Sequence, residues 1–255
     1  MVALIDADSL IYKTGFTFEQ KFDWNELELE LGIENEPDTY IEGDLLSAKN
    51  AIDGLIESIL FNTGCDSAEL WLTGDGNFRY DVLDSYKSNR KGSRKPTDYT
   101  GIWNYLVDSY GAHVARGYEA DDVVVYKKTH DPEEYFLCAI DKDVIYQCEG
   151  THYNYNKDEF ITVKLEEAER FFYEQVLTGD VVDGYKGCPG IGKARATKIL
   201  DKAEEDEVPY WELIIEAYEA KNLTEDDAIQ QARMASMHQL KEDSKGDYKV
   251  DLWKP

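Results

Sequence analysis

Residues 117–128 read GYEADDVVVYKK and join a cluster of acids directly to an apolar run. The pattern predicts a helix over 121–128, with Glu119, Asp121 and Asp122 at its start. A helix dipole favours acids in its first turn. Three carboxylates so close together still repel one another and lose hydration when buried, so a positive counter-charge is expected beside them.

Strand and helix patterns alternate on both sides of this stretch. Short apolar runs predict strands, and apolar residues at 52, 55, 56, 59 and 60 predict a helix over 45–64. This alternation predicts an α/β fold with a mostly parallel sheet. The remaining expected elements are strands at 2–7, 67–74, 112–117, 134–140, 152–156 and 159–164, and helices at 102–111 and 165–180. After about residue 165 the chain is expected to be helical, and residues 17–43 are expected to form an acidic surface insertion.

The composition narrows the class of protein. Hydrophobic residues make up 42% of the 255 residues, which is too many for a disordered chain. No apolar run approaches the length of a membrane span, and the start MVALIDADSL lacks the basic region of a signal peptide, so a soluble, cytoplasmic protein is expected. The four cysteines have no CxxC spacing, which favours free thiols. The four histidines form no HxH or HExxH pair, which argues against a zinc site.

The formal net charge of −26 argues against nucleic acid as a partner, but the distribution of the charge argues for it. Residues 79–95 hold six Lys or Arg against two Asp, a local charge of +4. Residues 186–198 hold four Lys or Arg and no acid, again +4. Two basic islands on an acidic body are expected to contact a polyanion, and the alternative is that they are solvated loops.

Acidic residues follow several of the predicted strands. Asp6 ends the first predicted strand, and Asp75 follows the second. Three acids follow the third strand, two follow the fourth, and two close the helix at 165–180. In that order they are Glu119, Asp121, Asp122, Asp141, Asp143, Asp180 and Asp183. Because parallel strands end at one edge of a sheet, most of these acids are expected to converge there. Each one alone is also explained as a helix cap or turn former, and Asp8 is interpreted in that way. A converging cluster needs hard cations, which indicates Mg²⁺ or Mn²⁺.

Metal-binding carboxylates beside basic islands suggest phosphate chemistry. Two ions roughly 3.5–4 Å apart can activate a water and stabilise the leaving oxygen of a displacement. Lys87 and Arg90, in SYKSNRK, would supply positive charge to the reacting phosphate. The stretch KGCPGIGKARA predicts a hairpin before a helix, whose backbone N–H groups bind phosphate without reading bases. Its predicted phosphate-binding residues are Lys186, Gly187, Gly190, Gly192, Lys193 and Arg195. The alternative for PGIG is an ordinary tight turn.

The order of these motifs resembles the flap endonuclease and 5′→3′ exonuclease family, most closely its podovirus-type members. The resemblance rests on LIDADSLIY, TGDGNFR, YKSNRK, GYEADD, AIDKD and TGDVVDGYKGCPGIGKARA, and with the C-terminal QARMASMHQLKEDSKGDYKVDLWKP it covers nearly the whole chain. It implies a PIN-like core over 1–178, with a short helical arch at 79–101, and a helix–hairpin–helix DNA-binding and C-terminal helical region over 179–255.

The resemblance also implies roles for residues. It assigns metal binding to Asp6, Asp75, Glu119, Asp121, Asp141, Asp143 and Asp183, with Asp122 and Asp180 as additional acids. Lys87 and Arg90 match a basic pair at the base of the arch. Arg79, Lys91, Arg94 and Lys95 of the first island are expected to contact nucleic acid. A K⁺ ion is implied at the hairpin.

The expected activity is hydrolysis of DNA from 5′ ends with two Mg²⁺ or Mn²⁺ ions, leaving a 5′-phosphate. We expect a monomer that recognises DNA, with an RNA–DNA hybrid as a further possible substrate. Within the same class, a flap endonuclease or an RNase H-like primer-removing nuclease stays open. In a different class, an acidic DNA mimic or scaffold would spread its carboxylates over a surface, whereas a nuclease concentrates them at one sheet edge.

Overall fold

A six-stranded sheet forms the centre of the protein in a computed structural model, which describes residues 1–23, 39–90 and 92–255. The strand order is β5-β4-β1-β6-β7-β8, and all neighbours are parallel except β7 and β8. The strands are β1 (Val2–Asp6), β4 (Ser67–Asn77), β5 (His113–Gly117), β6 (Tyr135–Cys138), β7 (Gly150–Asn154) and β8 (Glu159–Val163). The predicted α/β fold with a mostly parallel sheet is confirmed.

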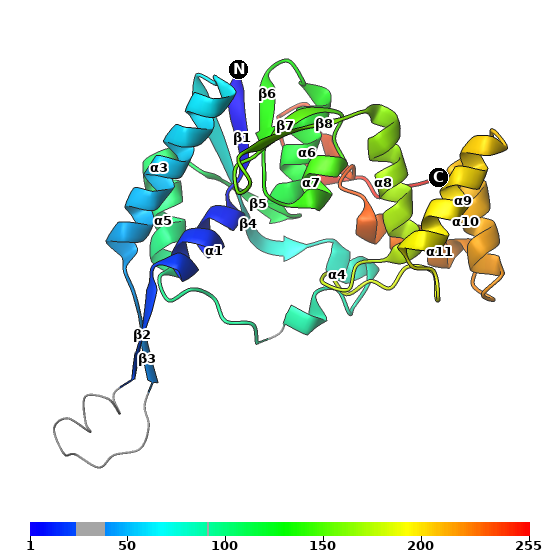
Figure 1. Cartoon of the computed structure of the whole chain (residues 1–255), viewed down its shortest axis with the longest axis horizontal. Helices are drawn as coiled ribbons and strands as arrows, with labels where there is room; N and C mark the ends of the chain where they lie inside the picture. Colours follow the sequence, from blue (N-terminus) through cyan, green and yellow to red (C-terminus); the bar gives the residue numbers. More distant parts are fainter. Residues whose placement is uncertain (24–38, 91) are drawn as a thin grey trace, which may run out of the picture.

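Helices cover both faces of this sheet (Figure 1). One apolar core joins the sheet to α1 (Asp8–Thr17), α3 (Leu45–Thr63) and α5 (Tyr99–Tyr110). A second core joins the opposite face to α6 (Ala120–His130) and α7 (Lys142–Tyr146). Central strands covered on both sides need apolar residues at successive positions, and residues 3–6 of β1 are accordingly all buried.

The C-terminal part of the chain forms a third core. It involves α8 (Leu165–Thr178), α9 (Lys193–Glu205), α10 (Tyr210–Glu219) and α11 (Glu225–Ala235). The expectation of helices alone after residue 165 is wrong, because β9 (Leu240–Glu242) and β10 (Tyr248–Val250) pair as an antiparallel hairpin. The division at 178/179 stays a prediction, since α8 contributes to the second core and to the third.

An antiparallel ribbon connects α1 to α3. Its strands are β2 (Glu19–Asp23) and β3 (Thr39–Gly43), and Figure 1 shows the pair extending away from the sheet. The acidic insertion predicted at 17–43 therefore contains two strands, and its residues 24–38 lie outside the described part of the chain. The ribbon is anchored to the basic island, because the two terminal guanidinium nitrogens of Arg94, Nη1 and Nη2, donate to the carboxylate of Glu19.

The predicted helical arch at 79–101 is wrong in its secondary structure. The segment holds only a single helical turn, α4 (Arg79–Val82), and a 3₁₀ turn (Ser88–Arg90) among its described residues before α5 begins. In Figure 1 the other described residues of this segment run as irregular chain between α4 and α5. Proline at 96 and glycine at 92 disfavour a continuous helix in this segment.

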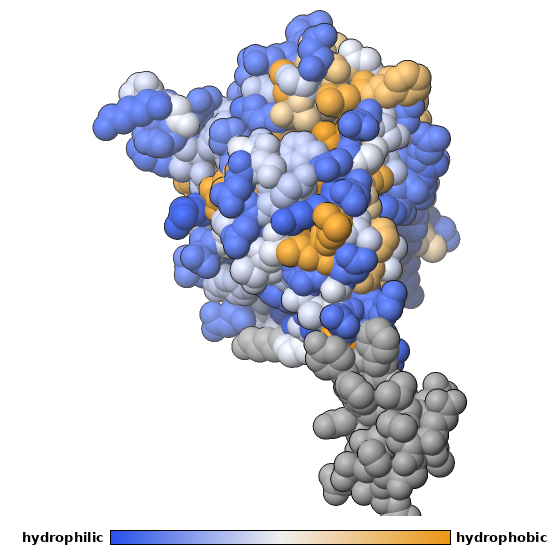
Figure 2. All heavy atoms as spheres, turned by 90° about the vertical axis from the view of Figure 1, so that its left-hand side faces the viewer, coloured by the Kyte–Doolittle hydropathy of each residue, from blue (hydrophilic) through white to orange (hydrophobic). Residues whose placement is uncertain are grey.

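The surface reflects the high charge of the chain. Figure 2 looks onto the side that bears α3, and this face is mostly hydrophilic with small hydrophobic patches. Within the described ranges, no helix is both long enough and apolar enough to cross a membrane.

Candidate active site

Five carboxylates line one cavity at the carboxyl edge of the sheet. The cavity has a volume of about 780 Å³, and we call its acids the first cluster: Asp6, Asp8, Glu119, Asp121 and Asp141. Asp6 ends β1 and Asp8 begins α1. Glu119 and Asp121 lie at the start of α6, which follows β5, and Asp141 follows β6. Parallel strands bring these segments together although more than 130 residues separate the outermost two.

The charges of the first cluster oppose one another. Burial raises the pKa of Asp6 well above its usual value, and the nearby Asp8 adds to the rise. Burial likewise raises the pKa of Asp121 well above its usual value, and repulsion from the charges of Asp6 and Glu119 raises it further. A buried group of this kind favours a bound cation, because the cation offsets the repulsion that otherwise retains a proton.

Glu119 differs because two basic side chains, Lys87 and Arg79, and the hydroxyl group of Tyr86 donate to its carboxylate. Lys87 Nζ lies 2.5 Å from Glu119 Oε1, and the hydroxyl of Tyr86 donates to Oε2 at 2.8 Å. Burial would raise the pKa of Glu119, but the charges of Lys87 and Arg79 outweigh it and lower the pKa. Glu119 is therefore held ionised and is the link between the acids and the basic island.

Three more acids form a second cluster beside the first: Asp143, Asp180 and Asp183. Lys142 Nζ lies 3.0 Å from Asp143 Oδ1 and 3.6 Å from Asp180 Oδ2. Burial raises the pKa of Asp143, and the charge of Asp141 adds to this. Burial also raises the pKa of Asp183, although Lys87 and Arg90 oppose the shift. The second cluster thus also combines partly buried acids with ammonium and guanidinium groups.

Lys87 and Arg90 lie between the two clusters. Arg90 Nη2 is 2.7 Å from Asp183 Oδ1, and Lys87 Nζ is 4.0 Å from the same oxygen. The backbone of Lys87 has a φ of 48°, in the left-handed region that residues with side chains rarely adopt. Its N–H donates to Asp183 O at 2.9 Å, so the segment between α4 and α5 and the loop after α8 fix each other. Close approach also requires glycine at 184, where a Cβ would lie 3.0 Å from Ser85 O at a φ of +80°.

The structure does not bring every predicted metal ligand into the clusters. Asp75 is exposed and does not line the acid cavity, but it lines an adjoining depression with Arg116 and with Lys95, which the two share. Asp122 is fully buried, with both oxygens bonded to Arg79, and it also accepts the N–H of Glu119. Its predicted role as a metal ligand is wrong, because these bonds occupy the carboxylate and no surface is left for an ion.

Arg79 contradicts its predicted contact with nucleic acid. Its side chain is 1% exposed. Besides Asp122, the guanidinium donates to Met234 O at 3.3 Å and Ser236 O at 2.8 Å. Arg79 is therefore an internal counter-charge that connects α4, α6 and the segment after α11, and the expected counter-charge beside the acids of 119–122 is partly this residue.

The hairpin before α9 exposes most of the residues predicted to bind phosphate. Lys186, Gly190, Gly192, Lys193 and Arg195 are exposed. Gly187 is different, because it is buried and its N–H already donates to Gln231 Oε1 at 2.8 Å, so the prediction that this N–H binds phosphate is wrong. A side chain at 187 would collide with the backbone of 177–179, which explains the glycine. Lys95 lines the acid cavity, whereas Lys91 lies outside the described residues.

Asp8 was missed by the sequence analysis as a member of the site. The helix cap is Ala7, and the carboxylate of Asp8 instead accepts the N–H of Thr73 at 3.1 and 3.2 Å. Burial raises the pKa of Asp8. Its spacing of two residues from Asp6, at the end of a strand, was the available signal. Tyr12, Tyr80 and Tyr99 also line the cavity, and no motif distinguished them from core aromatics.

The donor set suits a hard divalent cation. The two clusters offer carboxylate oxygens, which are the ligands that Mg²⁺ and Mn²⁺ prefer. Among the residues described, no three Asp, Glu, His or Cys side chains already form a closed ligand set. The ammonium groups of Lys87 and Lys142 lie among the acids instead. An ion at Glu119 or Asp143 would therefore compete with these ammonium groups for the carboxylate oxygens.

Sequence comparison finds relatives among phage exonucleases. No protein-family model matches the chain. The chain is 24% identical over 223 residues to an exonuclease of Escherichia phage T7, covering 73% of each protein. It is 24% identical over the same length to an exodeoxyribonuclease of Enterobacteria phage T3, covering 73% of this chain and 72% of the relative. A 5′-3′ exonuclease of Mycoplasmopsis pulmonis is 26% identical over 166 residues, which cover 58% and 53%.

Solved structures with a similar fold come from bacteriophage T5. The 5′-exonuclease of T5 bound to zinc ions has a TM-score of 0.57 at 16% identity, covering 92% of this chain and 93% of the other. A T5 flap endonuclease in a complex with DNA and metal ions has a TM-score of 0.59 at 17% identity, covering 92% and 89%. The fold is thus that of this class of 5′ nuclease. The resemblance seen in the sequence is confirmed: the chain is similar in sequence and in fold to phage-type 5′→3′ exonucleases and flap endonucleases.

Proposed function

We propose that the protein is a metal-dependent 5′→3′ exonuclease that hydrolyses DNA from 5′ ends and leaves a 5′-phosphate. The observation that carries this proposal is the position of Lys87 and Arg90 between two carboxylate clusters at one sheet edge. Acids that bind cations on both sides of a basic pair are suited to a phosphodiester, which needs positive charge around its non-bridging oxygens.

We assign the divalent ions, Mg²⁺ or Mn²⁺, to the two clusters. Asp6, Asp121 and Asp141 would hold one ion with Glu119 and Asp8 beside it, and Asp143, Asp180 and Asp183 would hold the other. Bound ions would supply an activated water and offset the charge of the leaving oxygen. Lys87 would leave Glu119 and donate to the phosphate, and Arg90 would orient the same group. Their charge then matters most in the transition state.

We further propose that the hairpin before α9 grips the DNA backbone. Its exposed Gly190 and Gly192, with Lys193 and Arg195, lie in a segment that continues from the second cluster. Backbone N–H groups and these cations would contact phosphates and fix the register of the DNA without reading bases. We also propose that a K⁺ ion binds at this hairpin. We propose further that the protein binds DNA as a monomer and that it acts on RNA–DNA hybrids.

A flap endonuclease is the second candidate within the class. Lys87, Arg90 and Lys95, which lie on either side of residue 91 in the chain, line the cavity, and such a row of cations would suit a single-stranded 5′ end. A DNA mimic is disfavoured because the Asp residues with raised pKa concentrate in the two neighbouring clusters and are not spread over the surface. A gel assay with 5′-labelled blunt, flap and RNA–DNA substrates separates these activities by the length of the first product.

The metal assignment is tested with Asp143→Asn and Asp183→Asn, which keep the side-chain shape but remove charge. We expect cleavage to collapse while DNA binding in Ca²⁺ survives, because binding also uses the hairpin. Normal cleavage by both variants with Mg²⁺ would refute the second metal site.

The role of Lys87 is tested separately. Lys87→Ala should lower the turnover rate much more than it lowers affinity for DNA, since the ammonium acts mainly in the transition state. Lys186→Ala is the control, because this exposed side chain lies on the hairpin and should affect affinity alone. An equal loss of rate and affinity in Lys87→Ala would reduce it to a residue that positions phosphate.

A further inference from the structure

A chain of buried amide groups leads from the C-terminal segment to the second cluster. Gln147 and Gln175 are 2% and 6% exposed. The N–H of Met237 donates to Gln147 Oε1 at 2.9 Å, and Gln147 Nε2 donates to Ala235 O at 2.8 Å and to Gln175 Oε1 at 3.0 Å. Gln175 Nε2 then donates to Asp143 Oδ1 at 2.8 Å.

We call this series of hydrogen bonds the relay. The backbone N–H at one end of the relay determines which group donates and which accepts in every bond. A backbone N–H can only donate, so the group of Gln147 that faces Met237 must be its oxygen. The amide nitrogen of Gln147 therefore faces Ala235 O and Gln175, which must accept through its own oxygen. This leaves the N–H₂ of Gln175 for Asp143, and a carboxylate is the acceptor that such a donor favours.

Asp143 gains a defined orientation from this bond. It is the second residue of the short helix α7, whose cap Asp141 accepts the N–H of Asp143 at 2.8 Å. The other donor to Asp143 Oδ1 is Lys142, whose side chain is 61% exposed. Gln175, unlike this lysine, is itself buried and its oxygen is held by the buried Gln147, which restricts the movement of its amide group. Among the two donors, it is the one able to fix the carboxylate.

We propose that Gln147 and Gln175 are positioning residues that preset Asp143 for a divalent cation and couple it to the segment Ala235–Met237. The inference rests on the proposed function, since it assumes that Asp143 binds an ion. Loss of a hydrogen-bond partner of a metal ligand typically lowers metal affinity about 10–100-fold. The competing explanation is that the two glutamines only join the C-terminal segment to α7 and α8.

The test compares Gln175→Met and Gln147→Met, which retain length and volume but cannot continue the relay. Ca²⁺ binding to the DNA-free protein is measured by calorimetry, and the melting temperature is measured in EDTA. Gln175→Met leaves the bonds of Gln147 to the backbone intact, so it is the variant expected to fold normally. We expect it to weaken binding of one ion about 10-fold, and we expect higher Mg²⁺ to restore its cleavage rate.

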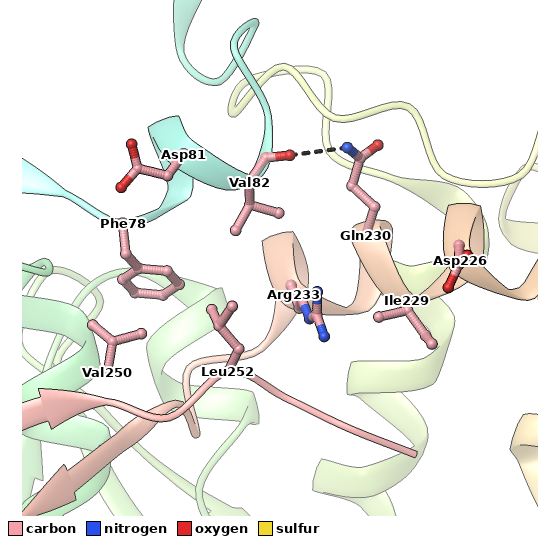
Figure 3. A pocket seen from close by; sticks show the side chains of 9 residues that line it. All are labelled: Phe78, Asp81, Val82, Asp226, Ile229, Gln230, Arg233, Val250 and Leu252. Carbon is pink, nitrogen blue, oxygen red and sulfur yellow. Dashed lines mark hydrogen bonds between the residues drawn. The ribbon is translucent and has the colours of Figure 1, made fainter.

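The second variant shows whether the two glutamines act in series. Gln147 lies one residue further from Asp143 in the relay, yet Gln147→Met should weaken the same ion in the same direction. The double variant should bind that ion no more weakly than Gln175→Met, because coupled residues are not additive. Gln230→Met is the matched control: it removes a bond to Val82 O, in a pocket of about 590 Å³ that no member of the two acid clusters lines (Figure 3), and it should not alter ion affinity.

Four outcomes would separate the explanations. Unchanged ion affinity in folded Gln175→Met would overturn the inference, and a lower melting temperature alone would leave the glutamines a purely structural role. Additive losses in the double variant would also overturn the series arrangement. Normal cleavage by Asp143→Asn would instead refute the proposed function, whatever the glutamine variants show.

Discussion

Replacing Arg79 by methionine tests the most informative difference between the sequence and the structure. The substitution leaves Asp122 buried and unpaired, and it removes two bonds to the carbonyls of Met234 and Ser236. Breaking a buried ion pair by removing one partner costs about 3–5 kcal/mol. A chain of this size loses about 2–4 °C per kcal/mol, so we expect the melting temperature in EDTA to fall by about 6–20 °C.

A second substitution should reverse much of this loss. The double variant Arg79→Met/Asp122→Leu has no unpaired buried carboxylate at position 122. Glu119, the other acidic partner of Arg79, keeps its bonds to Lys87 and Tyr86. The double variant should therefore be more stable than Arg79→Met alone, because replacing both partners of a buried pair is often close to neutral.

Thermal unfolding and DNA titration in Ca²⁺ at a temperature where all variants are folded give the two readouts. Arg79→Met should retain its affinity for DNA, because Arg79 has no exposed surface to contact it. Arg195→Met, at an exposed position, should behave in the opposite way, with lower affinity and a change in stability within about 0.5 kcal/mol. If Arg79→Met melted like the wild type and lost DNA affinity, Arg79 would be a surface contact and the buried network would be wrong.

Three further outcomes are expected. The melting temperature in EDTA should fall as the pH rises above the usual carboxyl pKa of 3.8: the raised pKa values of Asp6 and Asp121 mean that the folded state there holds more protons than the unfolded state, whereas Glu119, with a lowered pKa, acts below its usual value of 4.5. Asp121→Asn should flatten that dependence, and an unchanged slope would contradict the burial argument. Lys142→Met should tighten Ca²⁺ binding in calorimetry, because the ammonium competes with an ion at Asp143, and weaker binding would assign Lys142 to another role. Affinity for a 5′-ended duplex in Ca²⁺ should have a shallow slope against KCl, on the order of −3 to −5, since each neutralised phosphate contributes about −0.9; a steep slope would indicate a larger basic surface.

Local patterns in the chain were enough to predict the main elements and the sheet edge. The apolar run at 2–7 corresponds to β1, and the apolar helical stripe at 45–64 corresponds to α3, each within one residue. Both patterns were informative because a buried strand is apolar throughout and a helix packed on a sheet is apolar on one face. The grouping of Asp6, Glu119, Asp121 and Asp141 followed from their positions after parallel strands, which share one edge whatever the connections between them.

The partners of individual side chains needed the folded chain. Arg79 bonds to a carbonyl 155 residues away, and Gln175 meets Asp143 across 32 residues, so no spacing in the sequence encodes either contact. For the same reason Arg79 was predicted to contact nucleic acid and Asp122 to bind metal: a charged residue in a motif has the same letter whether it faces a ligand or an opposite buried charge. Burial and pairing are properties of the space between segments, and that space exists only after α4, α6 and the C-terminal segment have packed together.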